Sequence, residues 1–156
     1  MRLIPTLAFA FVAASMALPA YAGPAEDAFL GKLTGAWSGG GTATGADAGP
    51  ITCSMTFRPA DGGTHFSGSC NAAGVGFEQS FSGSVTYNDA KKRYEAVSNG
   101  RNQVGTKSGG GVTFVTKITG IVGKGTSTMK LTTNRITIDV ALTGDTPIKS
   151  HILFTK

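Results

Sequence analysis

The stretch over residues 51–71 constrains the fold most, because it reads as two alternating strands joined by a turn, with one cysteine in each strand. Residues 59–63 between the strands are turn formers, Pro-Ala-Asp-Gly-Gly. Every second side chain of each strand is apolar or small, as in a strand with one buried face. These two sets are Ile51, Cys53, Met55 and Phe57, and Thr64, Phe66, Gly68 and Cys70.

A hairpin folded symmetrically about Asp61 and Gly62 places Cys53 opposite Cys70 on the inward face. We therefore expect a disulfide between them. Closing a loop of about 16 residues stabilises a fold by about 3 kcal/mol on the chain-entropy model. Two buried free thiols are the alternative, and an export signal would favour the disulfide.

Residues 1–22 have the pattern of such a signal: Arg2, an apolar run, and the small-x-small motif Ala20-Tyr21-Ala22 that signal peptidases cut. An uncleaved membrane anchor is the alternative. Cleavage leaves residues 23–156, which is the size of one domain. No later segment is apolar enough to span a bilayer, so we expect a soluble protein in the periplasm or outside the cell.

The rest of the chain predicts one helix and a succession of strands. Residues 24–33 have Pro near the start, acids in the first turn and an apolar side, which predicts a short helix. A strand should open at Gly35 with Trp37, followed by a small-residue loop at 43–50. Asn99-Gly100 is a hairpin signal. Further alternating runs lie at 77–87, 93–98, 102–106, 112–119, 128–131, 135–142 and 148–155.

About ten strands, each with one apolar face and a short turn to the next, predict an all-β fold. We expect an up-and-down antiparallel barrel of about ten strands with one short N-terminal helix, because closure removes both sheet edges and covers the apolar face. A β-sandwich is the alternative, since alternation alone does not separate the two.

The charges and motifs do not indicate catalysis. The formal net charge of +5 includes one basic cluster, Lys91-Lys92-Arg93, and the outer faces carry no aromatic ladder, so nucleic-acid binding is not expected. No paired carboxylates, nucleophile elbow or Ser-His-Asp order can be assembled. Residues 120–126 lack the spacing of a phosphate loop and read as a hairpin. Two isolated histidines do not make a zinc site. We expect no enzyme activity.

The helix, the opening Gly35-Ala36-Trp37 and the run of antiparallel strands resemble the calycin superfamily, which includes lipocalins, fatty-acid-binding proteins, avidins and nitrobindin-like barrels. The glycines at 39 and 41 and the ending at 151–156 are most similar to nitrobindin-type barrels, in which a late histidine ligates haem. That likeness implies His151 as a haem ligand, although strand alternation places His151 on the polar face. The lipocalin likeness implies Lys149 or Arg135 packed over Trp37.

The inward set is almost uncharged and rich in Phe and Ile, which predicts a carrier or sensor for a small apolar molecule without another cofactor. The candidate lining residues are Trp37, Met55, Phe57, Phe66, Gln79, Phe81, Tyr94, Phe114, Thr116, Met129, Ile138 and Phe154. Among them Gln79 and Thr116 are the polar contacts. The same side chains would fill a solid core in the second hypothesis, a structural or protein-interaction module such as an inhibitor of a secreted enzyme.

Overall fold

The computed structural model describes residues 23–45, 48–73, 77–120, 123–145 and 147–156. The expected export signal at 1–22 lies outside the described residues. Within the described part of the chain, no helix combines the length and the apolar composition needed to cross a membrane.

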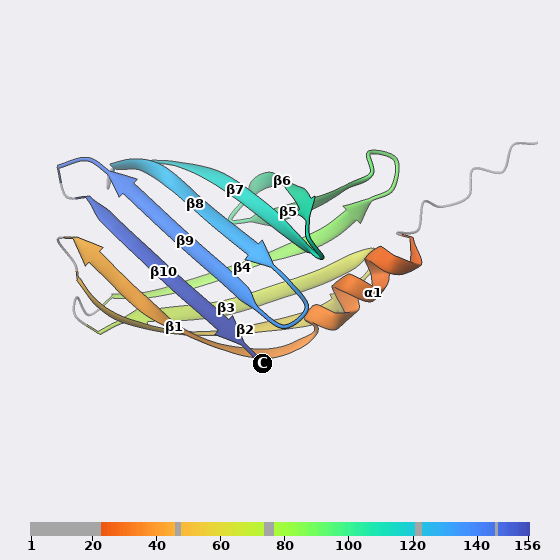
Figure 1. The fold of residues 1–156 in the computed structure, drawn as a ribbon, viewed down its shortest axis with the longest axis horizontal. Helices are drawn as coiled ribbons and strands as arrows, with labels where there is room; N and C mark the ends of the chain where they lie inside the picture. The colour runs from red at the N-terminus through yellow and green to blue at the C-terminus, as the bar shows by residue number, and fades with distance from the viewer. Residues whose placement is uncertain (1–22, 46–47, 74–76, 121–122, 146) are drawn as a thin grey trace, which may run out of the picture.

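One helix is followed by ten strands that close into an antiparallel barrel (Figure 1). Each strand pairs with the next in sequence, and β10 returns to pair with β1. The prediction of an up-and-down barrel is confirmed, and the sandwich alternative is wrong. The elements are α1 (Pro24–Leu33), β1 (Gly35–Gly45), β2 (Gly49–Ala60), β3 (Gly63–Ala72), β4 (Phe77–Asn88), β5 (Arg93–Ser98), β6 (Arg101–Ser108), β7 (Gly111–Gly120), β8 (Gly123–Leu131), β9 (Ile136–Thr143) and β10 (Ile148–Thr155).

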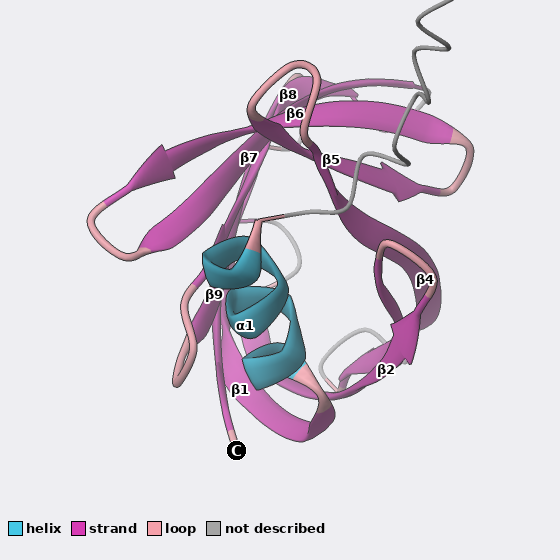
Figure 2. Cartoon of the chain, turned by 90° about the vertical axis from the view of Figure 1, so that its right-hand side faces the viewer, coloured by secondary structure: helices cyan, strands magenta, loops and turns pink. Residues whose placement is uncertain are grey.

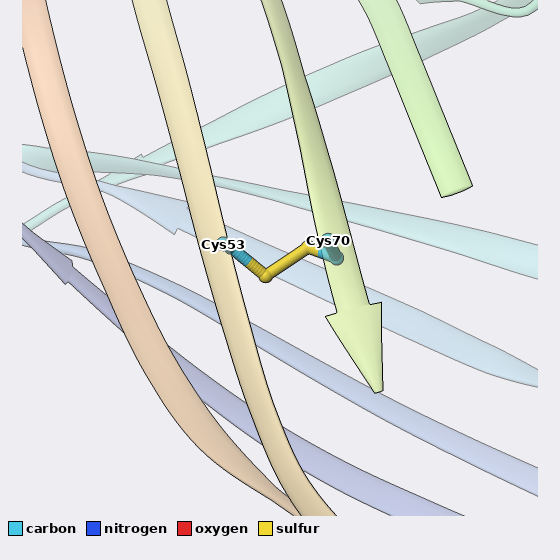
Figure 3. Close-up of a disulfide and its surroundings, with 2 residues drawn as sticks. All are labelled: Cys53 and Cys70. Atoms are coloured by element: carbon cyan, nitrogen blue, oxygen red, sulfur yellow. A yellow bond between two sulfur atoms is a disulfide. The ribbon is translucent and has the colours of Figure 1, made fainter. Parts of the chain in front are cut away.

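The β2–β3 hairpin has the register that its sequence predicts. Phe57 pairs with Phe66 and Cys53 pairs with Cys70 across the two strands. The cysteines form a disulfide with an S–S distance of 2.02 Å (Figure 3). The expected disulfide is confirmed, and it fixes the two strands to each other on the inward face of the barrel.

Helix α1 closes one end of the barrel (Figure 2). Pro24 lies in the first turn of the helix with Glu26 and Asp27. Negative charges at this end interact favourably with the helix dipole and stabilise the helix. Leu30 and Leu33 are buried in the barrel core. On the solvent side, Lys107 of β6 donates a 2.9 Å hydrogen bond to Glu26. The helix is therefore held by apolar contacts below it and by an ion pair to the barrel wall.

Trp37 joins α1 to the barrel. Its Nε1 donates a 2.8 Å hydrogen bond to the carbonyl of Leu33, and the ammonium of Lys156 lies 5.0 Å from the centre of its ring. The expectation of Lys149 or Arg135 over this ring is wrong. The C-terminal end of β10 is the part beside Trp37, whereas Lys149 pairs with Thr44 at the far end of β1 and Arg135 lies in the β8–β9 turn.

The expected loop at 43–50 is also wrong in part, because β1 continues to Gly45 and β2 begins at Gly49. Small residues that read as a loop instead allow neighbouring strands to approach closely. A Cβ on Gly45 would collide with the carbonyl oxygen of Pro147, beside Ile148 of β10. Only glycine fits this approach, so the glycine-rich composition here indicates a strand in close contact with its neighbour.

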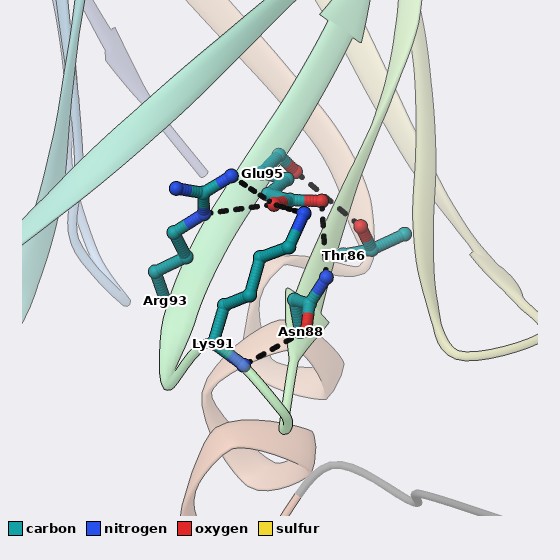
Figure 4. Close-up of polar contacts among 5 residues, drawn as sticks. All are labelled: Thr86, Asn88, Lys91, Arg93 and Glu95. Carbon is teal, nitrogen blue, oxygen red and sulfur yellow. Dashed lines mark hydrogen bonds and ion pairs between the residues drawn. The ribbon is translucent and has the colours of Figure 1, made fainter.

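The basic cluster at the β4–β5 turn is compensated by its neighbours (Figure 4). Glu95 accepts hydrogen bonds from Arg93 at 2.8 Å and Asn88 at 3.4 Å, and it forms an ion pair with Lys91. The hydrogen bond from Arg93 is the main reason that the pKa of Glu95 is lowered. Lys92 pairs with Asp89. These contacts favour a solvated hairpin tip over a binding patch for anions.

Tyr94 gives a test of the packing beneath α1. Its ring contacts Phe29 of the helix and Tyr87, and burial raises the pKa of Tyr94 to about 12, with a smaller contribution from the charge of Glu26. The folded state holds the phenolic proton more tightly than the unfolded chain does. This contribution to stability is therefore complete below about pH 10 and is lost as the pH rises towards 12.

We expect an absorbance titration at 295 nm to show one tyrosine that ionises near pH 12, together with loss of the folded state. In Tyr94→Phe that late step should disappear. A wild-type titration in which every tyrosine ionises close to pH 10 while the protein stays folded would contradict the packing described for Tyr94.

Candidate functional site

The most deeply buried large side chains of the barrel interior lie in the half next to α1. Trp37, Phe57, Phe114 and Phe154 are at most 2% exposed there and pack with Leu33 of the helix. Most of the candidate lining residues lie in this packed half and form its hydrophobic core. They are Trp37, Met55, Phe57, Phe66, Tyr94, Phe114 and Phe154.

The other five candidates lie further from α1. Phe81, Met129 and Ile138 are half-buried and pack against the core on its side away from α1. Thr116 is half-buried, and Gln79 is exposed although it pairs with Cys70 on an inward position. The structure therefore separates the candidates into a closed core and a more exposed set further from α1, in which Phe81, Met129 and Ile138 form a floor.

Above this floor runs a belt of small side chains. Strand register connects Thr116 of β7, Ser127 of β8, Val140 of β9, Ser150 of β10 and Ala43 of β1 in one row around the wall. Apart from Ala43, which is buried, these inward side chains are only half-buried. Other side chains therefore do not cover these positions completely.

The next row towards the open end is aliphatic again, with half-buried Ile118, Leu142 and Ile148. We call this set of half-buried inward side chains, from Phe81, Met129 and Ile138 through the belt to this rim, the open cup. Its wall is apolar with a few hydroxyls from Thr116, Ser127 and Ser150. An apolar wall with a few polar groups is typical of small-molecule sites.

Sequence reasoning named only Thr116 of the belt, because it selected mainly large inward side chains. The strand alternation already placed Val140 and Ser150 on inward faces, and their small size was the signal that could have located unfilled space. In a barrel of fixed width, small inward residues leave room and large ones remove it.

His151 lies on the outer face, as strand alternation predicts. Its Nδ1 lies 2.6 Å from Oδ1 of Asp139 on the neighbouring strand, and both side chains are more than half exposed. With Lys149 and outward threonines they line a shallow hollow of about 300 Å³ on the outside of the barrel. Sequence reasoning missed this pair, although both residues occupy outward positions of adjacent strands.

The histidines do not fit the haem that the nitrobindin likeness implies. A haem inside the barrel needs an inward ligand, whereas His151 faces outward and is occupied by Asp139. His65, the other histidine of the chain, is also exposed. Among the described residues, no group of three or more His, Cys, Asp or Glu side chains is placed to hold a metal ion.

In comparisons with known proteins, no protein-family model matches the chain and no curated protein matches its sequence. The open cup is thus the feature that most directly indicates a function.

Proposed function

We propose that this protein is an exported, calycin-like barrel that binds a small apolar molecule in the open cup, as a carrier or a sensor. The observation that carries the proposal is the belt of small, half-buried inward side chains between a packed core and an aliphatic rim. Burial of an apolar ligand against this wall would remove apolar surface from water, which is the main driving force for such binding.

Three further features support this proposal. The closed ten-strand barrel and the cation over Trp37 are compatible with the calycin resemblance. The Cys53–Cys70 disulfide supports export, because disulfides persist in oxidising compartments. The groups offered by the cup are hydroxyls and Gln79, which suit binding better than acid–base chemistry. We therefore propose a binding protein rather than an enzyme.

The test uses Ser127→Leu, which adds a larger side chain to the belt, and an environment-sensitive apolar dye as the probe. In an open cup the leucine enters free space, so we expect the dye affinity to fall by about tenfold while stability is unchanged. Dye fluorescence titration and urea unfolding of the same samples measure the two effects.

Thr128→Leu is the matched control, because Thr128 is the next residue of β8 and faces outward. It should change neither dye binding nor stability. If the interior were solid instead, Ser127→Leu would overpack it and cost about 1–3 kcal/mol, and the wild-type protein would not bind the dye. That combination would disprove the proposed function.

A further inference from the structure

The β5–β6 hairpin is too short to complete the barrel wall at the open end (Figure 1). The β4–β5 ladder begins at Gly83↔Ser98, and the β6–β7 ladder ends at Gly105↔Phe114. In the described chain, residues 77–82 of β4 and 115–120 of β7 therefore pair on one side only, with β3 and β8. We call the space between these two edges, with the Asn99-Gly100 turn at its base, the notch.

The edges of the notch offer backbone groups that a strand can use. An unpaired strand edge presents a row of N–H and C=O groups that can pair with another extended chain. The edge on β7 is six residues long, which is the length of an ordinary strand. The other side of β7 forms a continuous ladder with β8, which holds the edge in an extended conformation.

The exposed large apolar side chains of the described residues all lie beside the notch. Val97 of β5, Val104 of β6 and Val115 of β7 are 41%, 52% and 59% exposed. Their clustering on three successive strands is unlike the scattered exposure that a surface normally shows. The three valines alternate with the buried inward residues Ala96, Gly105 and Phe114, and they therefore lie on the outer face of the barrel.

The charges around the notch indicate which edge a partner uses and what it carries. Lys117 of β7 and Arg101 of β6 are exposed, and neither forms an ion pair with another described residue. Glu95 of β5 is already paired with Arg93. On the opposite border, β4 carries the exposed Glu78. The basic border is therefore that of β7, which favours an acidic partner there.

We propose that the notch binds an extended segment of another protein, in which apolar and acidic residues alternate, as an added strand along residues 115–120 of β7. Its apolar side chains face inward beside Thr116 and Ile118, and its acidic side chains lie on the outer face beside Lys117. This interaction is distinct from ligand binding in the cup. The added strand would cover the cup from the side.

The probe is an eight-residue peptide of alternating valine and glutamate with blocked ends. Hydrogen exchange followed by mass spectrometry should show slower exchange at 115–120 when the peptide is added, and unchanged exchange in β9. The same peptide with alternate amides methylated cannot pair with the edge and should not bind. Binding of the methylated peptide with equal affinity would overturn the proposal in favour of simple occupation of the cup.

Lys117→Glu tests the charge, with Lys130→Glu as the control on the outer face of β8 near α1. Reversing Lys117 should weaken peptide binding by about fivefold, and reversing Lys130 should leave it unchanged. Equal losses would show general charge attraction only, which contradicts a site at the notch.

A second copy of the chain is the other possible occupant. A dimer in native mass spectra without peptide, with slow hydrogen exchange at 115–120, would identify a second copy as the occupant and would also overturn the proposal. Dye binding in the cup should survive Lys117→Glu, so the two proposals can fail separately.

Discussion

Replacing Trp37 with alanine is expected to lower the free energy of unfolding by about 4 kcal/mol. The indole is 2% exposed and contacts Phe57 edge to face, so its removal leaves a large cavity in the packed half of the barrel. The substitution also removes the hydrogen bond to Leu33 and the ring beneath Lys156. Urea unfolding followed by far-ultraviolet circular dichroism measures the loss without needing tryptophan emission.

Trp37→Phe separates these contributions, because it keeps an aromatic ring and removes only the Nε1 donor and part of the volume. We expect a loss of about 1–3 kcal/mol for this variant. If Trp37→Ala cost less than about 1 kcal/mol, the indole would not be the link between α1 and the barrel that the contacts indicate.

Removing the disulfide with the double substitution Cys53→Ala and Cys70→Ala is expected to lower the free energy of unfolding by about 3 kcal/mol. The cysteines are 17 positions apart, so the bond restricts a loop of the unfolded chain. It also fixes the β2–β3 register beside Gln79, which pairs with Cys70. Urea unfolding of the oxidised wild type and the double variant measures the difference.

Reducing agent provides the control for this prediction. It should destabilise the wild type to about the level of the double variant and should not affect the double variant itself. An oxidised wild type no more stable than the double variant would contradict a stabilising role for the bond.

Local sequence patterns predict the fold well where one face of a strand is buried. Alternation specifies register, because a shift of one residue would expose the apolar set, and the pairing of Phe57 with Phe66 confirms this. The strand ends at 43–45 were harder to predict, since the small residues at 43–50 resemble a loop by composition. Their role depends on how closely β1 approaches β10, and that contact lies far apart in the sequence.

The candidate site was predicted less completely than the fold. Alternation identifies inward residues but does not say how far along the barrel the large ones extend. Phe114 and Ile118 share a face in the same strand, yet one is buried in the core and the other lies at the rim. The difference arises from α1, which covers the end of the barrel near Phe114, so depth in the barrel is a property of the whole fold.

The position of Trp37 also determines what its fluorescence can report. It is the only tryptophan of the chain, and it lies in the packed half beneath Lys156 and against α1, away from the belt that borders the open cup. Its emission maximum should respond to undocking of the helix and to unfolding, and should stay constant when the cup is filled. Intrinsic fluorescence is thus an optical signal for the folding equilibrium that is insensitive to occupancy of the cup.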